Sequence, residues 1–287
     1  MSADVTATRR YFVPRPSPYP ALMSFSIMLL AIGLGLGVNG YPAGRWFAGV
    51  GIILIIFALV RWIGKVIAES QGGFYHHWED RSFRLGMIWF IVSEVVLFAT
   101  LFGVLFYERE VSLPWLASLD AHFTPWPHFS GAWPSAGPAG KSFSTVYPWG
   151  IPALNTLLLI SSGATVTRAH YWLRRDRRDA LTFWLALTIL LGVIFLVLQV
   201  REFYEAYTEL GLTLGSGVYG ATFFALTGLH GFHVTVGVIM LTALLARILR
   251  GHFDASHHFA FEAVSWYWHF VDVVWLLLFV FVYWLGS

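Results

Sequence analysis

The chain has 287 residues, of which 57% are hydrophobic and 12% are charged, and its formal net charge is +2. A soluble domain usually carries roughly 25% charged residues, so this composition excludes an ordinary water-soluble fold and favours a protein embedded in lipid. The small net charge gives no indication of nucleic acid, and phospholipid headgroups are the expected anionic partners. The sequence has no cysteine, which excludes disulfides, iron–sulfur clusters and copper centres bridged by thiolates.

Seven stretches are long, apolar and nearly free of charge. Each predicts a membrane-spanning helix, because about 20 residues at a rise of about 1.5 Å cross the hydrocarbon core. In chain order they are residues 20–38, 46–64, 85–106, 148–167, 180–200, 218–246 and 263–286. The first follows a basic, proline-rich start and is long enough to span, so we expect it to be retained rather than cleaved as a signal peptide. The predicted fold is all-α and polytopic, with seven transmembrane helices.

The basic residues predict the orientation. Of the 18 Lys and Arg residues, only Arg45, Arg109, Lys141 and Arg201 fall on the side opposite to the N-terminus. Because cytoplasmic loops carry the excess of Lys and Arg, the N-terminus is predicted to be cytoplasmic and the C-terminus to lie outside. The arginine-rich segment 169–179 is the strongest cytoplasmic anchor.

Three parts follow from this topology. Residues 1–66 hold the N-terminal segment and the first two helices, residues 67–84 form a cytoplasmic connection, and residues 85–287 form a five-helix bundle. The longest connection in the bundle, residues 107–147, lies outside and is rich in Trp and Pro. These residue types predict an ordered aromatic cap rather than a flexible linker.

Glu94 is an ionisable residue inside the third predicted helix. Its neighbours one turn away are the apolar residues Phe90, Ile91, Leu97 and Phe98. A charge in such surroundings is costly, so the neutral carboxyl is favoured. Two interpretations stay open: an acid that relays or gates protons, or a neutral carboxyl that hydrogen-bonds a neighbouring helix.

Two further polar pairs lie inside predicted helices, His230 with His233 and His269 with Asp272. A spacing of three places each pair on one helix face. Polar packing is the favoured interpretation and metal ligation the minor one, because the Glu-x-x-His pairs of a di-iron site are missing. Glu202 follows the fifth predicted helix and is expected well above these groups. So few histidines cannot ligate two haems and a copper, so we expect any redox centre in another chain.

Small residues predict close helix contacts, within the chain and with another membrane subunit. They are Gly33, Gly35 and Gly37 in the first helix and Ser161, Ser162, Gly163 and Thr165 in the fourth, with Asn155 as a further polar contact.

Distinctive motifs run along the chain. The last helix begins with residues 257–263, HHFAFEA, and continues with residues 266–275, WYWHFVDVVW; the sixth contains residues 217–224, GVYGATFF, and residues 227–234, TGLHGFHV. Shorter motifs lie at residues 16–18, 69–70, 84–87, 93–95, 152–156 and 202–206. Together these stretches closely resemble the cytochrome c oxidase subunit III family, over nearly the whole chain.

The resemblance implies an accessory subunit of a proton-pumping cytochrome c oxidase in aerobic respiration. Haem and copper belong to the partner subunits I and II, cytochrome c is the electron donor, and this chain holds no redox cofactor and no metal. The resemblance also implies a cleft between the first two helices and the other five, filled with bound phospholipids and a candidate route for oxygen. The long outer connection favours a bacterial inner membrane over a mitochondrial one.

The resemblance gives roles to individual residues. Glu94 corresponds to the buried acid that the family associates with sustained proton uptake and with protection from inactivation during turnover. The residues at the family's lipid-headgroup positions are Trp62, Glu69, His76, His77 and Arg247.

Three alternatives stay open. The first is subunit III of a quinol oxidase, although those relatives tend to lack the first two helices. The second is a membrane di-metal oxidase that uses Glu94, His230, His233 and Asp272. The third is a transporter, for which interrupted helices are expected.

Overall fold

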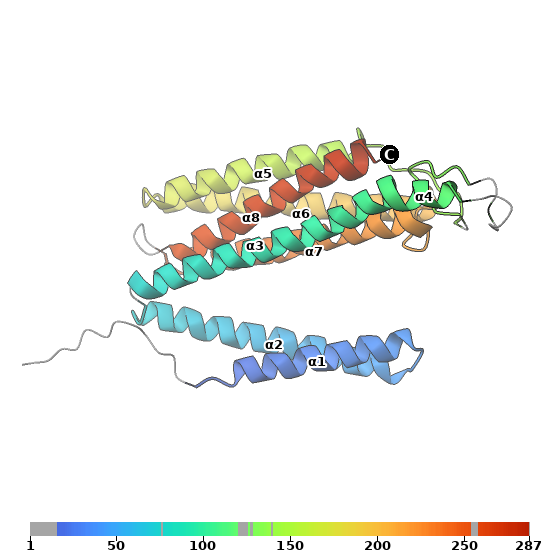
Figure 1. Cartoon of the computed structure of the whole chain (residues 1–287). Helices are drawn as coiled ribbons and strands as arrows, with labels where there is room; N and C mark the ends of the chain where they lie inside the picture. Colours follow the sequence, from blue (N-terminus) through green and yellow to red (C-terminus); the bar gives the residue numbers. More distant parts are fainter. Residues whose placement is uncertain are drawn as a thin grey trace, which may run out of the picture. The chain divides into compact units, whose positions relative to one another are not determined.

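The computed structural model describes residues 16–75, 77–119, 126, 129–138, 140–253 and 258–286, except for the side chain of His77. Every regular element in these residues is helical (Figure 1). The helices are α1 (Tyr19–Val38), α2 (Ala43–Gln71), α3 (His77–Tyr107), the short α4 (Leu113–Ala117), α5 (Ile151–Leu173), α6 (Arg178–Thr208), α7 (Gly217–Leu249) and α8 (Phe259–Leu278). Two π-helical turns, η1 (Glu108–Ser112) and η2 (Phe279–Trp284), follow α3 and α8.

In the described residues, six helical stretches are long and apolar enough to cross a membrane, so the chain is an integral membrane protein. They are α1, α2, α6, α7 and the continuous stretches Trp78–Ala117 and Phe259–Trp284. The prediction of an all-helical protein is confirmed, and six of the seven predicted spans meet this criterion. The exception, α5, has 23 residues and buries polar side chains such as Asn155 and Ser162. Such side chains make α5 less apolar, so its crossing stays a prediction.

The helices are longer than the apolar stretches that predicted them. Most of residues 67–84, expected to be a connection, are helical because α2 runs to Gln71 and α3 begins at His77. The expected connection 107–147 likewise begins with η1 and α4. Helix α6 continues to Thr208, so Glu202 lies inside a helix rather than beyond its end. Helical hydrogen bonding continues past the first charged residue, where an apolar run ends, because long polar side chains can turn toward water.

The chain divides into two compact units, Met1–Leu85 and Gly86–Ser287. In the first unit, glycines set the contact between α1 and α2. A Cβ atom on Gly33 would clash with the backbone of Ala48, and one on Gly44 with the backbone of Gly37. These contacts confirm the predicted close approach, which small residues permit in membranes. Gly35 takes no part, since a Cβ there would meet nothing within 4 Å.

The second unit has an aromatic core in which α8 is central. Trp268 is fully buried, and its indole Nε1 donates a hydrogen bond of 2.9 Å to Ser162 Oγ on α5. Its ring fills the space above two glycines: an added Cβ would lie 2.8 Å from the ring at Gly192 on α6 and 2.7 Å at Gly237 on α7. One side chain therefore joins α5, α6, α7 and α8.

A second tryptophan of α8, Trp275, repeats this arrangement about two turns further along. Trp275 is fully buried, donates to Thr156 Oγ1 at 2.9 Å, and stacks edge-on against Phe195 at 4.7 Å. Helix α5 also contacts α6 through side chains, since the hydroxyls of Thr165 and Thr188 lie 2.8 Å apart. The predicted packing role of the small polar residues of α5 is thus confirmed at Thr165 as well as at Ser162.

Two aromatic residues in the described part of segment 107–147, Trp133 and Phe143, pack against the core of the second unit. Trp133 donates from Nε1 to the Gly286 carbonyl at 3.0 Å, and its ring meets Tyr219 edge-on at 5.4 Å. Trp115 is 61% exposed. The predicted aromatic cap is therefore present at Trp133 and not at Trp115.

Candidate functional site: a carboxyl–imidazole pair between α3 and α7

Glu94 of α3 and His233 of α7 form a direct contact. The distance from Glu94 Oε2 to His233 Nε2 is 2.9 Å, and the two side chains are only 17% and 9% exposed. The residues are 139 positions apart in the chain, so the contact is created by the fold. Of the two predicted interpretations of Glu94, the hydrogen bond to a neighbouring helix is present.

The hydrogen bond of the other ring nitrogen of His233, Nδ1, determines which protonation states allow the contact with Glu94. Nδ1 lies 2.8 Å from the Leu229 carbonyl, which can only accept, so Nδ1 carries a hydrogen. Nε2 of a neutral imidazole is then an acceptor, and it needs the protonated carboxyl of Glu94 as donor. The alternative is an imidazolium that donates to a carboxylate. In both cases one proton is held between Glu94 and His233.

Aromatic rings surround the pair. Phe98 is 3% exposed, and its ring meets the imidazole of His233 edge-on at 5.2 Å. The Tyr267 hydroxyl of α8 donates to the His233 carbonyl at 3.2 Å, and Phe90 stacks on the Tyr267 ring at 6.2 Å. These contacts hold the imidazole in one orientation and exclude competing hydrogen-bond partners from its sides.

The second histidine of the predicted pair has a different environment. His230 is fully buried, and its Nε2 donates to the Val271 carbonyl at 3.2 Å. Its ring also lies 5.2 Å from that of Trp275. His230 and His233 therefore serve different partners and do not converge on one ion, which supports polar packing for His230.

The predicted His269–Asp272 pair lies against α5. His269 Nδ1 is 3.5 Å from Asp272 Oδ2, and His269 Nε2 is 3.2 Å from the hydroxyl of Thr167. A Cβ atom on Gly163 would clash with the Asp272 carboxylate. The absence of a side chain at Gly163 thus leaves room for the Asp272 carboxylate. The His269–Asp272 pair contacts α5 from α8.

A buried network around Glu202 was missed by the sequence reasoning. Glu202 is 2% exposed and accepts hydrogen bonds from the Tyr283 hydroxyl at 2.6 Å and from Gln199 Nε2 at 3.1 Å. Asn155, predicted as a polar contact, reaches Gln199 Oε1 at 3.4 Å. The sequence feature that could have indicated this network is Gln199, because a polar amide at the end of an apolar run needs a hydrogen-bond partner.

Trp62 was predicted to bind lipid, and it borders an apolar depression in the first unit. The depression has room of about 270 Å³ and is lined by Trp62, Leu59, Ile63 and Val66. The Trp62 ring also stacks on Tyr19 at 6.5 Å. A surface with only apolar lining suits an acyl chain rather than a polar ligand.

Glu69, a second predicted lipid residue, lies on α2 with Lys65 at 3.9 Å and accepts a hydrogen bond of 2.7 Å from the Tyr75 hydroxyl. Burial, this hydrogen bond and the carboxylate charge raise the pKa of Tyr75, so its phenol stays protonated at neutral pH. Two further predicted lipid residues lie outside the described part of the chain, His76 entirely and His77 with its side chain.

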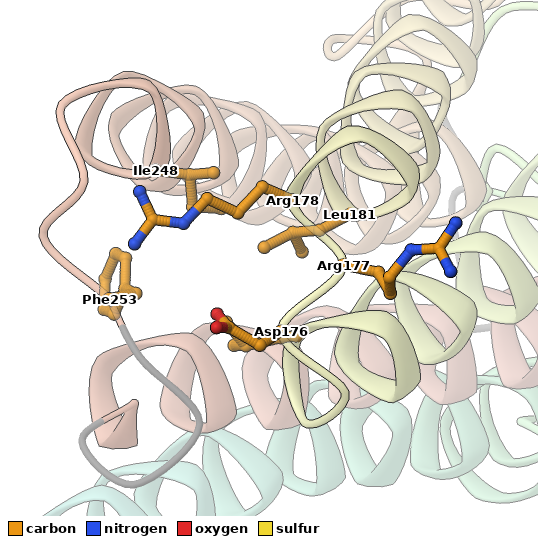
Figure 2. Close-up of a pocket in the computed structure, with 7 residues that line it drawn as sticks. Asp176, Arg177, Arg178, Leu181, Ile248 and Phe253 are labelled. Carbon is orange, nitrogen blue, oxygen red and sulfur yellow. The ribbon is translucent and has the colours of Figure 1, made fainter.

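Arg247, the last predicted lipid residue, lies near the arginine-rich turn between α5 and α6. Its guanidinium carbon sits 4.3 Å from the centre of the Phe253 ring. The turn, α6 and the end of α7 enclose a cavity of about 10 Å³ (Figure 2). Figure 2 shows Arg178 directed across this cavity and Arg177 directed away from it. Such a volume is near the roughly 10–15 Å³ that one water needs, so a headgroup does not fit inside.

Comparison with known proteins decides the family. The family model described as cytochrome c oxidase subunit III matches residues 9–287. The chain belongs to this family. Among individual members, "Cytochrome c oxidase subunit 3" of Danio rerio is 39% identical over 281 residues, covering 96% of this chain and 97% of the relative. The proteins of the same name from Oryctolagus cuniculus and Equus caballus are 37% and 38% identical, and each alignment covers 98% of both chains. The resemblance that the motifs indicated is thus confirmed, and it extends over nearly the full length of the chain and of its relatives.

Proposed function

We propose that the chain is the accessory subunit III of a proton-pumping cytochrome c oxidase, assembled with the haem- and copper-bearing subunits I and II. The family match over residues 9–287 carries this proposal. The names of the relatives favour cytochrome c over a quinol as the electron donor of the complex.

The ligand inventory supports a chain without redox centres. The sequence has no cysteine. The histidines inside the described spans each contact protein groups: His230 bonds a carbonyl, His233 bonds Glu94, and His269 lies between Asp272 and Thr167. Among the described residues, these side chains do not share one coordination centre, which supports the proposal that haem and copper lie in the partner subunits.

The proposed role of the Glu94–His233 pair is to hold and release a proton. The pair binds one proton between two groups that are nearly enclosed by aromatic rings, and moving it requires only a shift along a 2.9 Å contact. Such a group can sustain proton uptake by the neighbouring catalytic subunit. The proposal links the two roles: by sustaining proton uptake, the pair protects the catalytic centre from inactivation during turnover.

The same proposal includes the membrane arrangement. We place the N-terminus in the cytoplasm from the distribution of Lys and Arg, count α5 as the seventh span, and propose a lipid-filled cleft between the first two helices and the rest. Trp62, Glu69, His76, His77 and Arg247 contact its phospholipids. A bacterial inner membrane is proposed from the long segment 107–147; the reported relatives are eukaryotic and do not support that part.

The Glu94→Gln variant tests the proposed role. Glutamine keeps the size and the hydrogen-bonding ability of the side chain but cannot exchange a proton, so we expect assembly and initial turnover within about two-fold of wild type. The number of turnovers before inactivation should fall several-fold. The measurement is oxygen consumption by the purified complex followed until activity stops.

Three further variants make the result specific. His233→Asn should shorten the active lifetime as Glu94→Gln does, and the double variant should add little, because both remove the same proton site. Glu205→Gln is the control, since Glu205 pairs with Arg201 at 2.7 Å, remote from the pair. Inactivation at the wild-type rate in Glu94→Gln would leave only a packing role for the pair.

A further inference from the structure

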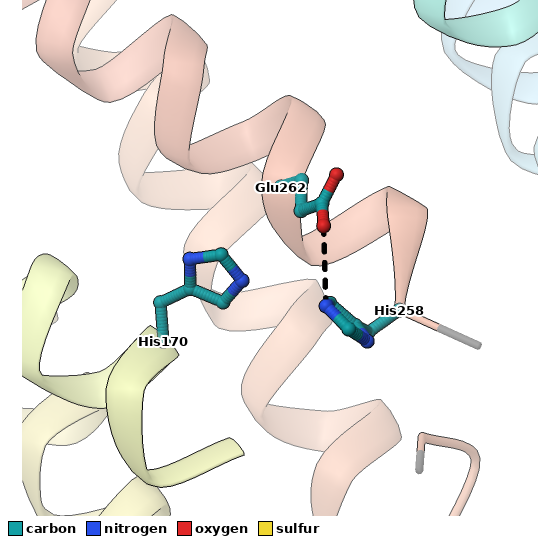
Figure 3. A group of neighbouring side chains, drawn as sticks. All are labelled: His170, His258 and Glu262. Atoms are coloured by element: carbon teal, nitrogen blue, oxygen red, sulfur yellow. Dashed lines mark ion pairs between the residues drawn. The ribbon is translucent and has the colours of Figure 1, made fainter. Parts of the chain in front are cut away.

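Three metal-binding side chains meet where α5 ends and α8 begins. His170 lies in the last turn of α5, His258 immediately precedes α8, and Glu262 lies in the first turn of α8 (Figure 3). Each offers one ligand atom, and these three atoms all lie within 4.8 Å of one another. This cluster is separate from the Glu94–His233 pair. Membership of the subunit III family does not by itself give these three residues a role.

The geometry of the cluster suits a shared ion. His258 Nε2 lies 3.1 Å from Glu262 Oε1, a consequence of their i,i+4 spacing. Two donor atoms bound to one tetrahedral zinc ion, at about 2.1 Å each, lie about 3.4 Å apart. Figure 3 shows a ring nitrogen of His170 directed toward the His258–Glu262 pair. All three side chains are half-buried, so an ion could reach them from the aqueous side.

The position of His170 argues for more than a hydrogen-bonded pair. Its Nε2 is buried and has no hydrogen-bond partner among the described residues. A buried polar atom left unpaired costs roughly 1–3 kcal/mol. Its ring is nevertheless held in place, 5.5 Å from that of Phe261 and 5.4 Å from that of His258. A bound cation would give this nitrogen a partner without moving the helices.

We propose that His170, His258 and Glu262 form a binding site for a divalent cation of the zinc class, which links the end of α5 to the start of α8. Two imidazoles and one carboxylate are ligands that suit Zn²⁺, whereas Mg²⁺ and Ca²⁺ prefer sites built from oxygen. Three protein ligands leave a fourth position for water. The sequence was expected to hold no metal, and this site departs from that expectation. The candidate metal ligands weighed in the sequence were groups deep in the predicted spans, and this cluster lies at helix ends.

Zinc binding to the purified protein, with the subunits that accompany it, tests this site. The preparation is dialysed against micromolar ZnCl₂ with millimolar MgCl₂, and bound zinc is counted by mass spectrometry. We expect wild type to hold one zinc more than His170→Gln, and Glu262→Gln to bind that zinc at least ten-fold more weakly. His252→Gln is the control, because His252 follows α7 and is not part of the cluster. Equal zinc content in wild type and His170→Gln would overturn the proposal.

A measurement on the wild-type protein covers the case in which the variants do not accumulate. Diethyl pyrocarbonate modifies unliganded imidazoles, and peptide mass spectrometry locates the modified histidines. Zinc should slow the modification of His170 and His258 at least five-fold and leave that of His269 unchanged. Unchanged modification of His170 and His258 in the presence of zinc would also overturn the proposal. Neither result depends on oxidase activity, so each is distinct from a failure of the proposed function.

Discussion

The two units of this chain use different means to pack membrane helices. In the first, α1 and α2 meet through glycines, and only 11% of the most apolar window of each helix is buried. In the second, half of the corresponding window of α8 is buried, and indole–hydroxyl hydrogen bonds connect α8 to α5. Contact between α1 and α2 therefore covers little of their apolar surface, whereas half of the most apolar window of α8 is buried inside the second unit.

This difference reflects the solvent. Lipid tails are as apolar as leucine, so apolar side chains gain little by moving from lipid into a helix contact. Close backbone approach and hydrogen bonds are the remaining sources of stability. The first unit relies on close approach, and the second combines it with buried polar contacts. Substitutions that remove one contribution at a time can separate the two.

The largest effect is expected in the core of the second unit. Trp268→Ala removes a fully buried indole that contacts Gly192 and Gly237, and it leaves Ser162 without its donor. Large-to-small changes of this kind cost about 3–5 kcal/mol, so thermal stability in detergent should fall sharply. The control is Trp89→Ala on α3, whose side chain is 70% exposed. Equal melting temperatures for the two variants would contradict a core centred on Trp268.

The next effect distinguishes two glycines of α1 that lie two positions apart. Gly33→Val should destabilise the α1–α2 pair by about 1–3 kcal/mol, because its side chain would meet the backbone of Ala48. Gly35→Val should be tolerated within roughly 0.5 kcal/mol, since nothing lies within 4 Å of its Cβ position. Protease resistance of the connection between α1 and α2 reports the result. The account of the first unit is wrong if both variants behave alike.

A smaller effect isolates one hydrogen bond of the second unit. Thr156→Val keeps the shape of the side chain but removes the acceptor of the Trp275 indole, with an expected cost of about 0.5–1.5 kcal/mol. Thr235→Val is matched to it, because that hydroxyl only bonds the Gly231 carbonyl of its own helix and is exposed. Comparison of their unfolding midpoints gives the value of the interhelical bond, and no difference would mean that the bond contributes nothing.

The smallest effect on stability concerns lipid. Arg247→Ala should change the free energy of unfolding by less than about 1 kcal/mol, the range for a partly exposed group, yet reduce the number of phospholipids retained during purification. Arg250→Ala serves as control, since Arg250 is exposed at the end of the same helix. Native mass spectrometry counts the lipids. An unchanged count in Arg247→Ala would remove Arg247 from the proposed lipid site.

Sequence patterns predicted the helices well because their cause is local. Each span is an apolar run, and its existence follows from the cost of exposing backbone polar groups to lipid. The ends were less predictable: α6 extends to Thr208, well past the last residue of its apolar run, because helical hydrogen bonds do not depend on side-chain polarity. Hydropathy therefore predicts which residues lie in the membrane, and it does not predict where a helix ends.

Sites were predictable only as far as they are local in sequence. The spacing of His269 and Asp272 was sufficient to place them on one face. That Glu94 meets His233, 139 positions away, depends on how α3 packs on α7 and α8, which periodicity does not reveal. His170 likewise joins His258 and Glu262 only through the fold, although the i,i+4 spacing of the latter two was visible in the sequence.

The central claim is that this chain acquires its chemistry from neighbouring subunits. The most direct measurement is a visible absorption spectrum, with iron and copper counts, of the tagged chain purified in mild detergent and again after its subunits are separated. The account predicts haem and copper in the intact preparation, their recovery in the other subunits, and a separated chain that is colourless. A separated chain that keeps a haem spectrum and reduces oxygen by itself would contradict it.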